Sequence, residues 1–200
     1  MIDTKINTSG WRAYYSETQG RAADPLVALA LEALGHERRG MALDLGSGAG
    51  VNARHLVDSG FARVHAVDQN PFAADHTKGV DSVTFILKRM ERYEAECSSL
   101  DIVLSIRALW FLFKPDIKKV VIMAHRALRP GGVFAFNLMG MEADWVKDSV
   151  VCGFTTTEVM EITQGWEVLY QKEERSHSAP TGKTVPIQWH EWHLILRKPD

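Results

Sequence analysis

The chain has 200 residues, of which 46% are hydrophobic and 24% charged, and its formal net charge is −2 at pH 7. This composition predicts an ordinary soluble chain that can bury one sizeable core. The near-neutral charge provides no basic field for holding a phosphate backbone, so we expect no nucleic-acid partner.

The amino terminus and the cysteines bear on the compartment in which the protein works. The first residues, MIDTKINTSGWR, are charged and polar where a signal peptide needs an apolar core, and no run reaches transmembrane length. Cys97 and Cys152 are far apart and form no CxxC pair, which argues against a disulfide scaffold and a zinc ribbon. We therefore expect a cytoplasmic protein with no membrane partner.

Helices and strands alternate along the first two thirds of the chain. Pro25–Leu34 is apolar, begins on a proline suited to a first helical turn and stops at Gly35, so it predicts a helix. Further helices are predicted over 51–59 and 116–128, and strands over 41–45, 63–67, 82–87, 101–105 and 132–138. This alternation indicates a parallel sheet covered on both faces. The Arg-Pro-Gly-Gly at 129–132 is interpreted as a helix stop and turn.

The pattern changes after residue 138. Thr155 and Glu158 form a capping box, which predicts a short helix ending near Gly165. Two β-rich runs follow, 166–172 and 188–197, joined by the polar stretch EERSHSAPTGKTVP, and they predict a final antiparallel hairpin. His190 and His193 are three apart on the second run and point to opposite faces of a strand, so we expect no metal site.

A glycine-rich loop follows the first predicted strand, in the order Ala42-Leu-Asp-Leu-Gly-Ser-Gly-Ala-Gly50. A dinucleotide-binding loop needs G-x-G-x-x-G, and Val51 occupies the position of its third glycine. Asp44 places a negative charge where a pyrophosphate would be repelled and an ammonium group attracted. Asp68 ends the next strand 22 positions after Gly46 (68 minus 46), near the roughly 20 expected for a ribose-binding carboxylate.

The series LDLGSGAG, AVDQN, DIVLS and ALRPGGVFAFNL, over roughly residues 40–138, resembles the motif series of class I S-adenosylmethionine-dependent methyltransferases. With its YY and GR lead-in and histidine-rich hairpin, the chain is most similar to the TehB-like (tellurite resistance type) group. The resemblance implies an α/β, Rossmann-like, three-layer αβα fold, with a seven-stranded, mostly parallel sheet and an antiparallel last strand. It also implies S-adenosyl-L-methionine as the cofactor.

The resemblance assigns roles along the cofactor. It implies that the glycine loop lines the methionine end, that Asp44 lies near the ammonium group and that Asp68 takes the ribose hydroxyls. An acid that the family often carries near the adenine has no counterpart in register, so Arg89 and Met90 are expected at the adenine edge. The expected cofactor-binding residues are Tyr15, Arg21, Asp44, Gly46, Ser47, Gly48, Asp68, Gln69, Arg89, Met90 and Ser105.

The methyl acceptor should meet segments that flank the same edge of the sheet. Arg107, Arg175 and His177 are the candidate catalytic residues on this side. An arginine there could steer an oxyanion, whereas a neutral amine or hydroxyl would need a base such as His177 or His193. A thiolate, selenol or oxyanion would need none.

The leading hypothesis is a methyltransferase acting on a small molecule, such as a chalcogen oxyanion or a thiol. SIRAL stands after the fourth strand where DNA amino-methyltransferases carry an NPPY-like motif, which again disfavours nucleic acid. An NAD(P)-dependent oxidoreductase and a non-catalytic cofactor-binding module are the alternatives. We expect a single domain over 1–200, working as a monomer or homodimer. It divides into a helical lid (1–38), a cofactor-binding core (40–138) and a C-terminal helix and hairpin (139–200).

Overall fold

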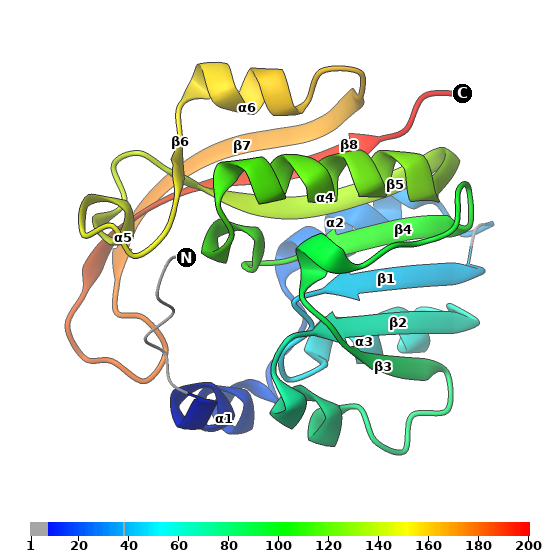
Figure 1. Ribbon diagram of the computed structural model, residues 1–200, viewed down its shortest axis with the longest axis horizontal. Coiled ribbons are helices and arrows are strands. Elements are labelled where there is room, and N and C mark those ends of the chain that lie inside the picture. Colours follow the sequence, from blue (N-terminus) through cyan, green and yellow to red (C-terminus); the bar gives the residue numbers. More distant parts are fainter. Residues whose placement is uncertain (1–7, 38) are drawn as a thin grey trace.

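The structure, a computed structural model, describes residues 8–37 and 39–200 (Figure 1). The expectations about residues 1–7, at the amino terminus, and about residue 38, the end of the expected lid, lie outside the described residues. The strands are β1 (Met41–Leu45), β2 (Arg63–Asp68), β3 (Val83–Leu87), β4 (Leu100–Ser105), β5 (Leu128–Gly140), β6 (Gly153–Phe154), β7 (Glu167–Ser178) and β8 (Ile187–Arg197). The α-helices are α1 (Thr8–Thr18), α2 (Pro25–Leu34), α3 (Val51–Asp58), α4 (Lys114–Ala127), α5 (Asp144–Lys147) and α6 (Thr156–Ile162), and the 3-10 helices are η1 (Pro71–His76), η2 (Met90–Arg92) and η3 (Leu109–Phe111).

The strands form one sheet in the order β3-β2-β1-β4-β5-β8-β7, and the short β6 pairs with the end of β5. Neighbours from β3 to β5 are parallel, whereas β8 is antiparallel to both β5 and β7. The expected mostly parallel sheet with an antiparallel last strand is therefore confirmed. Because β8 is antiparallel to both β5 and β7, these two strands run in the same direction. The carboxyl end of β7 therefore lies on the same side of the molecule as the carboxyl ends of β1, β4 and β5.

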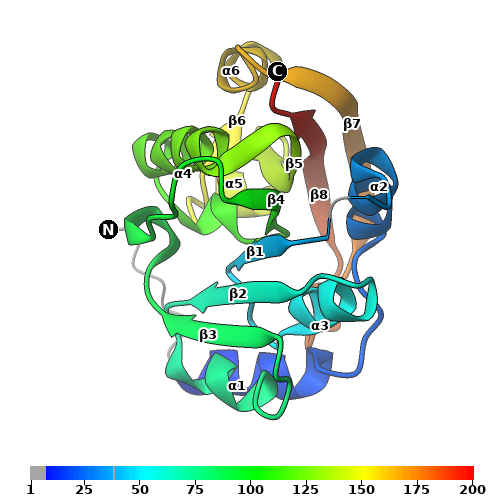
Figure 2. The same ribbon diagram turned by 90° about the vertical axis from the view of Figure 1, so that its right-hand side faces the viewer.

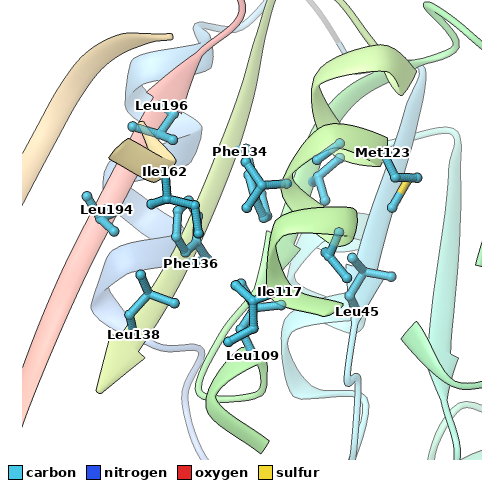
Figure 3. Close-up of a cluster of buried hydrophobic side chains, with 14 of the residues drawn as sticks. Leu45, Leu109, Ile117, Met123, Phe134, Phe136, Leu138, Ile162, Leu194 and Leu196 are labelled. Atoms are coloured by element: carbon cyan, nitrogen blue, oxygen red, sulfur yellow. The ribbon is translucent and has the colours of Figure 1, made fainter. Parts of the chain in front are cut away.

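Helices cover both faces of this sheet. Figure 2 shows α4 on one side and α2 and α3 on the other. The larger core cluster packs beneath α4 and α6 (Figure 3), where Phe134 and Phe136 stack with ring centroids 4.4 Å apart. Burial of each side chain of this kind contributes about 1.5–3 kcal/mol. No helix within the described part of the chain has both the length and the apolar character of a membrane span.

Asp101 joins three segments at the edge of the sheet where β1 and β4 begin. It is 2% exposed, and its Oδ2 accepts the backbone N–H groups of Gly40 and Met41 at 2.9 and 3.0 Å. Its Oδ1 accepts Nη1 of Arg129 at 2.6 Å. The expected Arg-Pro-Gly-Gly turn is instead the start of β5, where the pairing with β4 shifts in register. Gly131 permits the irregular backbone here through its φ of 73°.

The closing hairpin is confirmed, but its polar connection is shorter than expected. β7 continues to Ser178, which pairs with Ile187, so EERSHS belongs to the strand and only residues 179–186 connect the two. The prediction was wrong because β7 is an edge strand whose outer half faces water, so it lacks the apolar alternation that marks a strand. At the tip, Nη1 of Arg21 donates to Oγ1 of Thr181 at 2.9 Å, which joins the hairpin to the segment after α1.

We expect Asp101→Ala to lower the free energy of unfolding by about 3 kcal/mol, because two backbone donors and Arg129 lose their acceptor. Urea denaturation followed by far-UV circular dichroism measures the change. Asp116→Ala is the control, since this partly exposed aspartate in the first turn of α4 pairs with the exposed Lys119 and should change the value by roughly 0.5 kcal/mol. Equal losses in the two variants would contradict the role given to Asp101.

Candidate functional site

The glycine-rich loop turns away from the sheet directly after β1. Gly46, Gly48 and Gly50 have φ values of 73°, 48° and 68°, a left-handed conformation that side chains rarely adopt. A Cβ at Gly46 would also collide with the side chain of Ala108, which lies after β4. The loop therefore requires glycine both for its backbone conformation and for its close approach to the segment after β4.

Asp44 is a buried acid with unmet hydrogen-bonding capacity. It is 1% exposed, and its Oδ2 has no hydrogen-bond partner within the described part of the chain. Burial, and then the nearby Asp68, raise the pKa of Asp44 to about 7, although the backbone N–H of Ala53 acts in the opposite direction. A carboxylate in this state is stabilised by a bound cation.

Asp68, at the end of β2, is by contrast well supplied with donors. It accepts the backbone N–H of Gly48 at 2.9 Å, the backbone N–H of Asn70 at 2.8 Å and the hydroxyl of Tyr15 at 3.3 Å. Burial raises the pKa of Asp68, while these hydrogen bonds and the N–H of Gln69 lower it. The backbone N–H of Gln69 is directed at this carboxylate, and the residue itself is exposed.

Tyr15 of α1 covers the glycine-rich loop. It is 4% exposed, and a Cβ built on Gly48 would lie 3.1 Å from its ring. Burial, and then the negative charge of Asp68, raise the pKa of the Tyr15 hydroxyl, so it remains a donor to that carboxylate. The structure therefore brings the lid residue, the loop and the β2 acid into direct contact.

The other expected cofactor-binding residues divide into two groups. Ser47 is buried with an Oγ that has no partner among residues 8–37 and 39–200, and Met90 approaches Gly46, with its Cε 3.1 Å from a Cβ built there. Ser105 is buried and donates to the carbonyl of Leu45 at 3.2 Å, so it joins β4 to β1. The two arginines are engaged elsewhere: Arg89 pairs with Glu91, and Arg21 contacts the hairpin.

The candidate catalytic residues do not converge. Arg175 makes a bidentate pair with Glu142, at 3.0 and 2.8 Å, and also bonds Glu173 at 3.0 Å. Hydrogen bonds to Glu142 and then to Glu173 raise the pKa of Arg175, so the guanidinium stays charged and its charge is balanced by these two carboxylates. It lines, together with His177, a surface groove of about 570 Å³. Arg107 pairs with Asp24 at 3.4 Å, at the start of α2 on the other side of the sheet.

A row of rings, which we call the aromatic row, joins segments that are far apart in the sequence. Trp11 lies 5.5 Å from Phe111, Phe111 lies 6.4 Å from Trp145, and Trp145 lies 5.0 Å from Trp189, measured between ring centroids. Trp11 in turn contacts Tyr15 at 5.8 Å. The row thus runs from the lid over the glycine-rich loop to β8. Its members are far apart in sequence and share no period, so only the fold reveals it.

Residues 43–136 match the model of a family described as a methyltransferase domain. No curated protein matches the sequence. A similar solved structure is the 1,6-didemethyltoxoflavin N1-methyltransferase of Burkholderia thailandensis with bound S-adenosylhomocysteine, which is 20% identical over 98% of this chain and 85% of its own, with a TM-score of 0.70. TehB of Haemophilus influenzae is 18% identical over 94% of this chain and 67% of its own, with a TM-score of 0.71. A chain of the complex between the Haloferax volcanii Trm112 methyltransferase activator and a methyltransferase is 18% identical over 99% of this chain and 98% of its own, with a TM-score of 0.73.

We expect Asp44→Asn to increase the free energy of unfolding of the ligand-free protein at pH 7.5, by on the order of 1–3 kcal/mol. An acid whose folded pKa is raised binds its proton more tightly in the folded state. It therefore costs stability as the pH rises from its ordinary value, about 4, through about 7. Thermal denaturation between pH 4 and pH 8 measures the difference between the two proteins.

The control for this experiment is Asp75→Asn, at an exposed aspartate whose pKa is lowered by Lys78. That change removes a favourable pairing and should not stabilise the protein at neutral pH. Identical pH profiles for wild type and Asp44→Asn would contradict the raised pKa of Asp44.

Proposed function

We propose that this chain, a class I S-adenosylmethionine-dependent methyltransferase by its methyltransferase domain and its fold, transfers the methyl group to a small molecule. The observation that carries the proposal is the buried Asp44 with its unpartnered oxygen beside a loop of left-handed glycines. This arrangement suits a ligand that ends in a cationic amino acid group and has no phosphate at the turn.

The residues present fit the cofactor. Asp44 would hold the ammonium group, while Ser47 and the loop backbone would line the methionine end. When bound, S-adenosylmethionine supplies a methyl group that is already activated as a sulfonium. The chain itself therefore needs mainly to align the acceptor and exclude water, and such positioning can supply roughly 7–11 kcal/mol of the barrier.

Asp68 and Tyr15 would hold the ribose end. The Tyr15 contact is the longest of the three side-chain and backbone distances to Asp68, at 3.3 Å, so a ribose hydroxyl is best placed to replace or share it. The buried ring of Tyr15 would stay over Gly48 through packing alone. In this proposal the lid (1–38), the core (40–138) and the C-terminal part (139–200) act as one domain, which works as a monomer or homodimer.

The chalcogen oxyanion or thiol acceptor considered from the sequence receives less support than a small molecule in general. Arg175 already faces two carboxylates, so it offers little attraction to an oxyanion. The Burkholderia neighbour holds bound 1,6-didemethyltoxoflavin, and the aromatic row of this chain offers a surface for contact with a planar organic molecule. The oxidoreductase alternative is disfavoured by Asp44 and by Val51 in the position of the third glycine.

We expect the wild-type protein to bind S-adenosylmethionine with a micromolar dissociation constant in isothermal titration calorimetry. Asp44→Asn keeps the shape of the side chain but removes its charge, and should weaken binding roughly 10- to 100-fold. Asp116→Asn is the matched surface control and should leave the affinity unchanged. Binding of NADH in place of S-adenosylmethionine would overturn the proposal.

The affinity for S-adenosylmethionine should also depend on pH. In the ligand-free protein the pKa of Asp44 is about 7, so at lower pH the binding of S-adenosylmethionine must first remove the proton of Asp44. The affinity should therefore fall by roughly tenfold per pH unit between pH 7 and pH 5. The ammonium group stays protonated across this range. The Asp44→Asn variant should lack this slope, and a wild type without the slope would argue against Asp44 as the partner of the ammonium group.

A further inference from the structure

A group of polar side chains beside β8 is not explained by the cofactor site. Glu191 and His193 lie two residues apart on β8, so both project from the face opposite to the one that carries His190 and its partner Arg175. Asn137 of β5 pairs with His193 in the sheet. We call Glu191, His193 and Asn137, together with Arg107 after β4, the β8 polar cluster.

Glu191 is the member of this cluster that points to a ligand. It is 8% exposed, and its Oε1 finds no hydrogen-bond partner in the part of the chain that the structure describes. Nε of Arg107 lies 3.9 Å from this oxygen, and the same Nε lies nearer to Asp24, at 3.4 Å. A buried carboxylate oxygen left in this state costs free energy until a donor reaches it. The cluster therefore presents a hydrogen-bond acceptor.

His193 presents a donor beside this acceptor. The backbone N–H of Arg107 donates to Oδ1 of Asn137 at 3.1 Å, which leaves Nδ2 of Asn137 to face Nδ1 of His193 at 2.9 Å. Because an amide Nδ2 can only donate, Nδ1 accepts and the neutral ring carries its proton on Nε2.

The Nε2 atom of His193 is buried without a hydrogen bond to any described residue, although Oε2 of Glu174 lies 3.3 Å away at ion-pair distance. In this tautomer the neutral ring has no free lone pair with which to accept a proton. His193 is therefore poorly placed to be the general base considered from the sequence. Its available group is the Nε2–H donor.

Two further features favour a position of the cluster on the side of the cofactor site where the methyl acceptor would bind. The side chain of Ala108, the residue after Arg107, occupies the space that a Cβ on Gly46 would need, so Arg107 lies next to the glycine-rich loop. Trp189 lies on the same face of β8 as Glu191, two residues earlier, and contacts Trp145 with the two ring planes 59° apart. Both rings are half-buried, so part of each is free to contact a planar ligand.

We propose that the β8 polar cluster and the Trp145–Trp189 end of the aromatic row form the subsite for the methyl-accepting substrate. This substrate is a planar nitrogen heterocycle that carries an N–H group beside a carbonyl oxygen or a ring nitrogen able to accept a hydrogen bond. Glu191 accepts the N–H of the heterocycle, His193 donates to its acceptor atom, and the tryptophans contact its face. The proposal rests on the methyltransferase function above and names the substrate class of that site.

The surrounding charge sets a further condition on the ligand. Asp24, Glu174 and Glu191 are acidic, and Arg107 is the cation that contacts Asp24 and Glu191. Lys172 pairs with Glu174 and lies on the outer strand. This balance is unfavourable for a phosphorylated or carboxylated heterocycle, so the ligand should be an uncharged base.

The test uses three pairs of probes, each consisting of a heterocycle and its N-methylated counterpart: uracil and 1,3-dimethyluracil, xanthine and caffeine, and lumazine and 1,3-dimethyllumazine. Binding is followed by tryptophan fluorescence with saturating S-adenosylhomocysteine and without it. We expect the wild-type protein to bind at least one N–H-bearing probe roughly tenfold or more tightly than its counterpart. If no N–H-bearing probe binds, or if each pair binds equally, the subsite is wrong.

Glu191→Met removes the acceptor and keeps the side-chain volume, and it should abolish the preference for the N–H-bearing probe. Its thermal stability shows that it is folded, and its affinity for S-adenosylmethionine should match that of the wild type. Glu167→Met, on the exposed edge strand, is the control and should keep the preference. A preference that persists in Glu191→Met overturns the role of Glu191. A protein that binds no S-adenosylmethionine yet prefers the N–H-bearing probes would overturn the proposed function and leave the subsite intact.

Discussion

The affinity of a buried carboxylate for a cation is the interaction around which the site is built. Asp44 is placed at the end of a central parallel strand, away from water, with one oxygen unpartnered. The glycines let the backbone pass close to this acid without side chains, and Tyr15 packs over the loop from outside. At the opposite ends of the same strands, Asp101 is by contrast fully engaged, because its oxygens accept three hydrogen bonds.

Those parts of the fold in which neighbours in sequence are neighbours in space could be predicted from the sequence. The apolar runs of β1, β2, β4 and β5, the capping box at Thr155 and the glycine-rich loop each depend on local patterns. The pairing of Arg175 with Glu142 was not predictable, because the two residues are 33 positions apart and only the folded chain brings their side chains together. The same holds for Trp145, which belongs to no sequence motif and joins the aromatic row only through its contacts with Phe111 and Trp189.

Arg175 and Arg107, two of the expected catalytic residues, lie on opposite faces of the sheet at β8. Arg175 is paired with His190 on one face, and Arg107 approaches Glu191 on the other. On one face, His190 bonds Glu173 at 2.8 Å and receives the backbone N–H of Glu142 at 3.1 Å, so the charges around Arg175 are satisfied within the chain. On the other face, Glu191 remains incompletely paired. A strand has a period of two, so one position along β8 separates a stabilising network from a group available to a ligand.

The contact between Arg21 and Thr181 links the segment after α1 to the connection between β7 and β8. It is an exposed hydrogen bond, and bonds of this kind typically contribute only about 0.5–1.5 kcal/mol. The position of α1 is therefore held mainly by the buried ring of Tyr15 and its hydrogen bond to Asp68, and the exposed contact at the hairpin is a minor addition. The first helix is consequently fixed at two points, at the glycine-rich loop through Tyr15 and beside α3 and η1 through Gln19, which contacts Arg54 and His76, and the hairpin adds a third and weaker point.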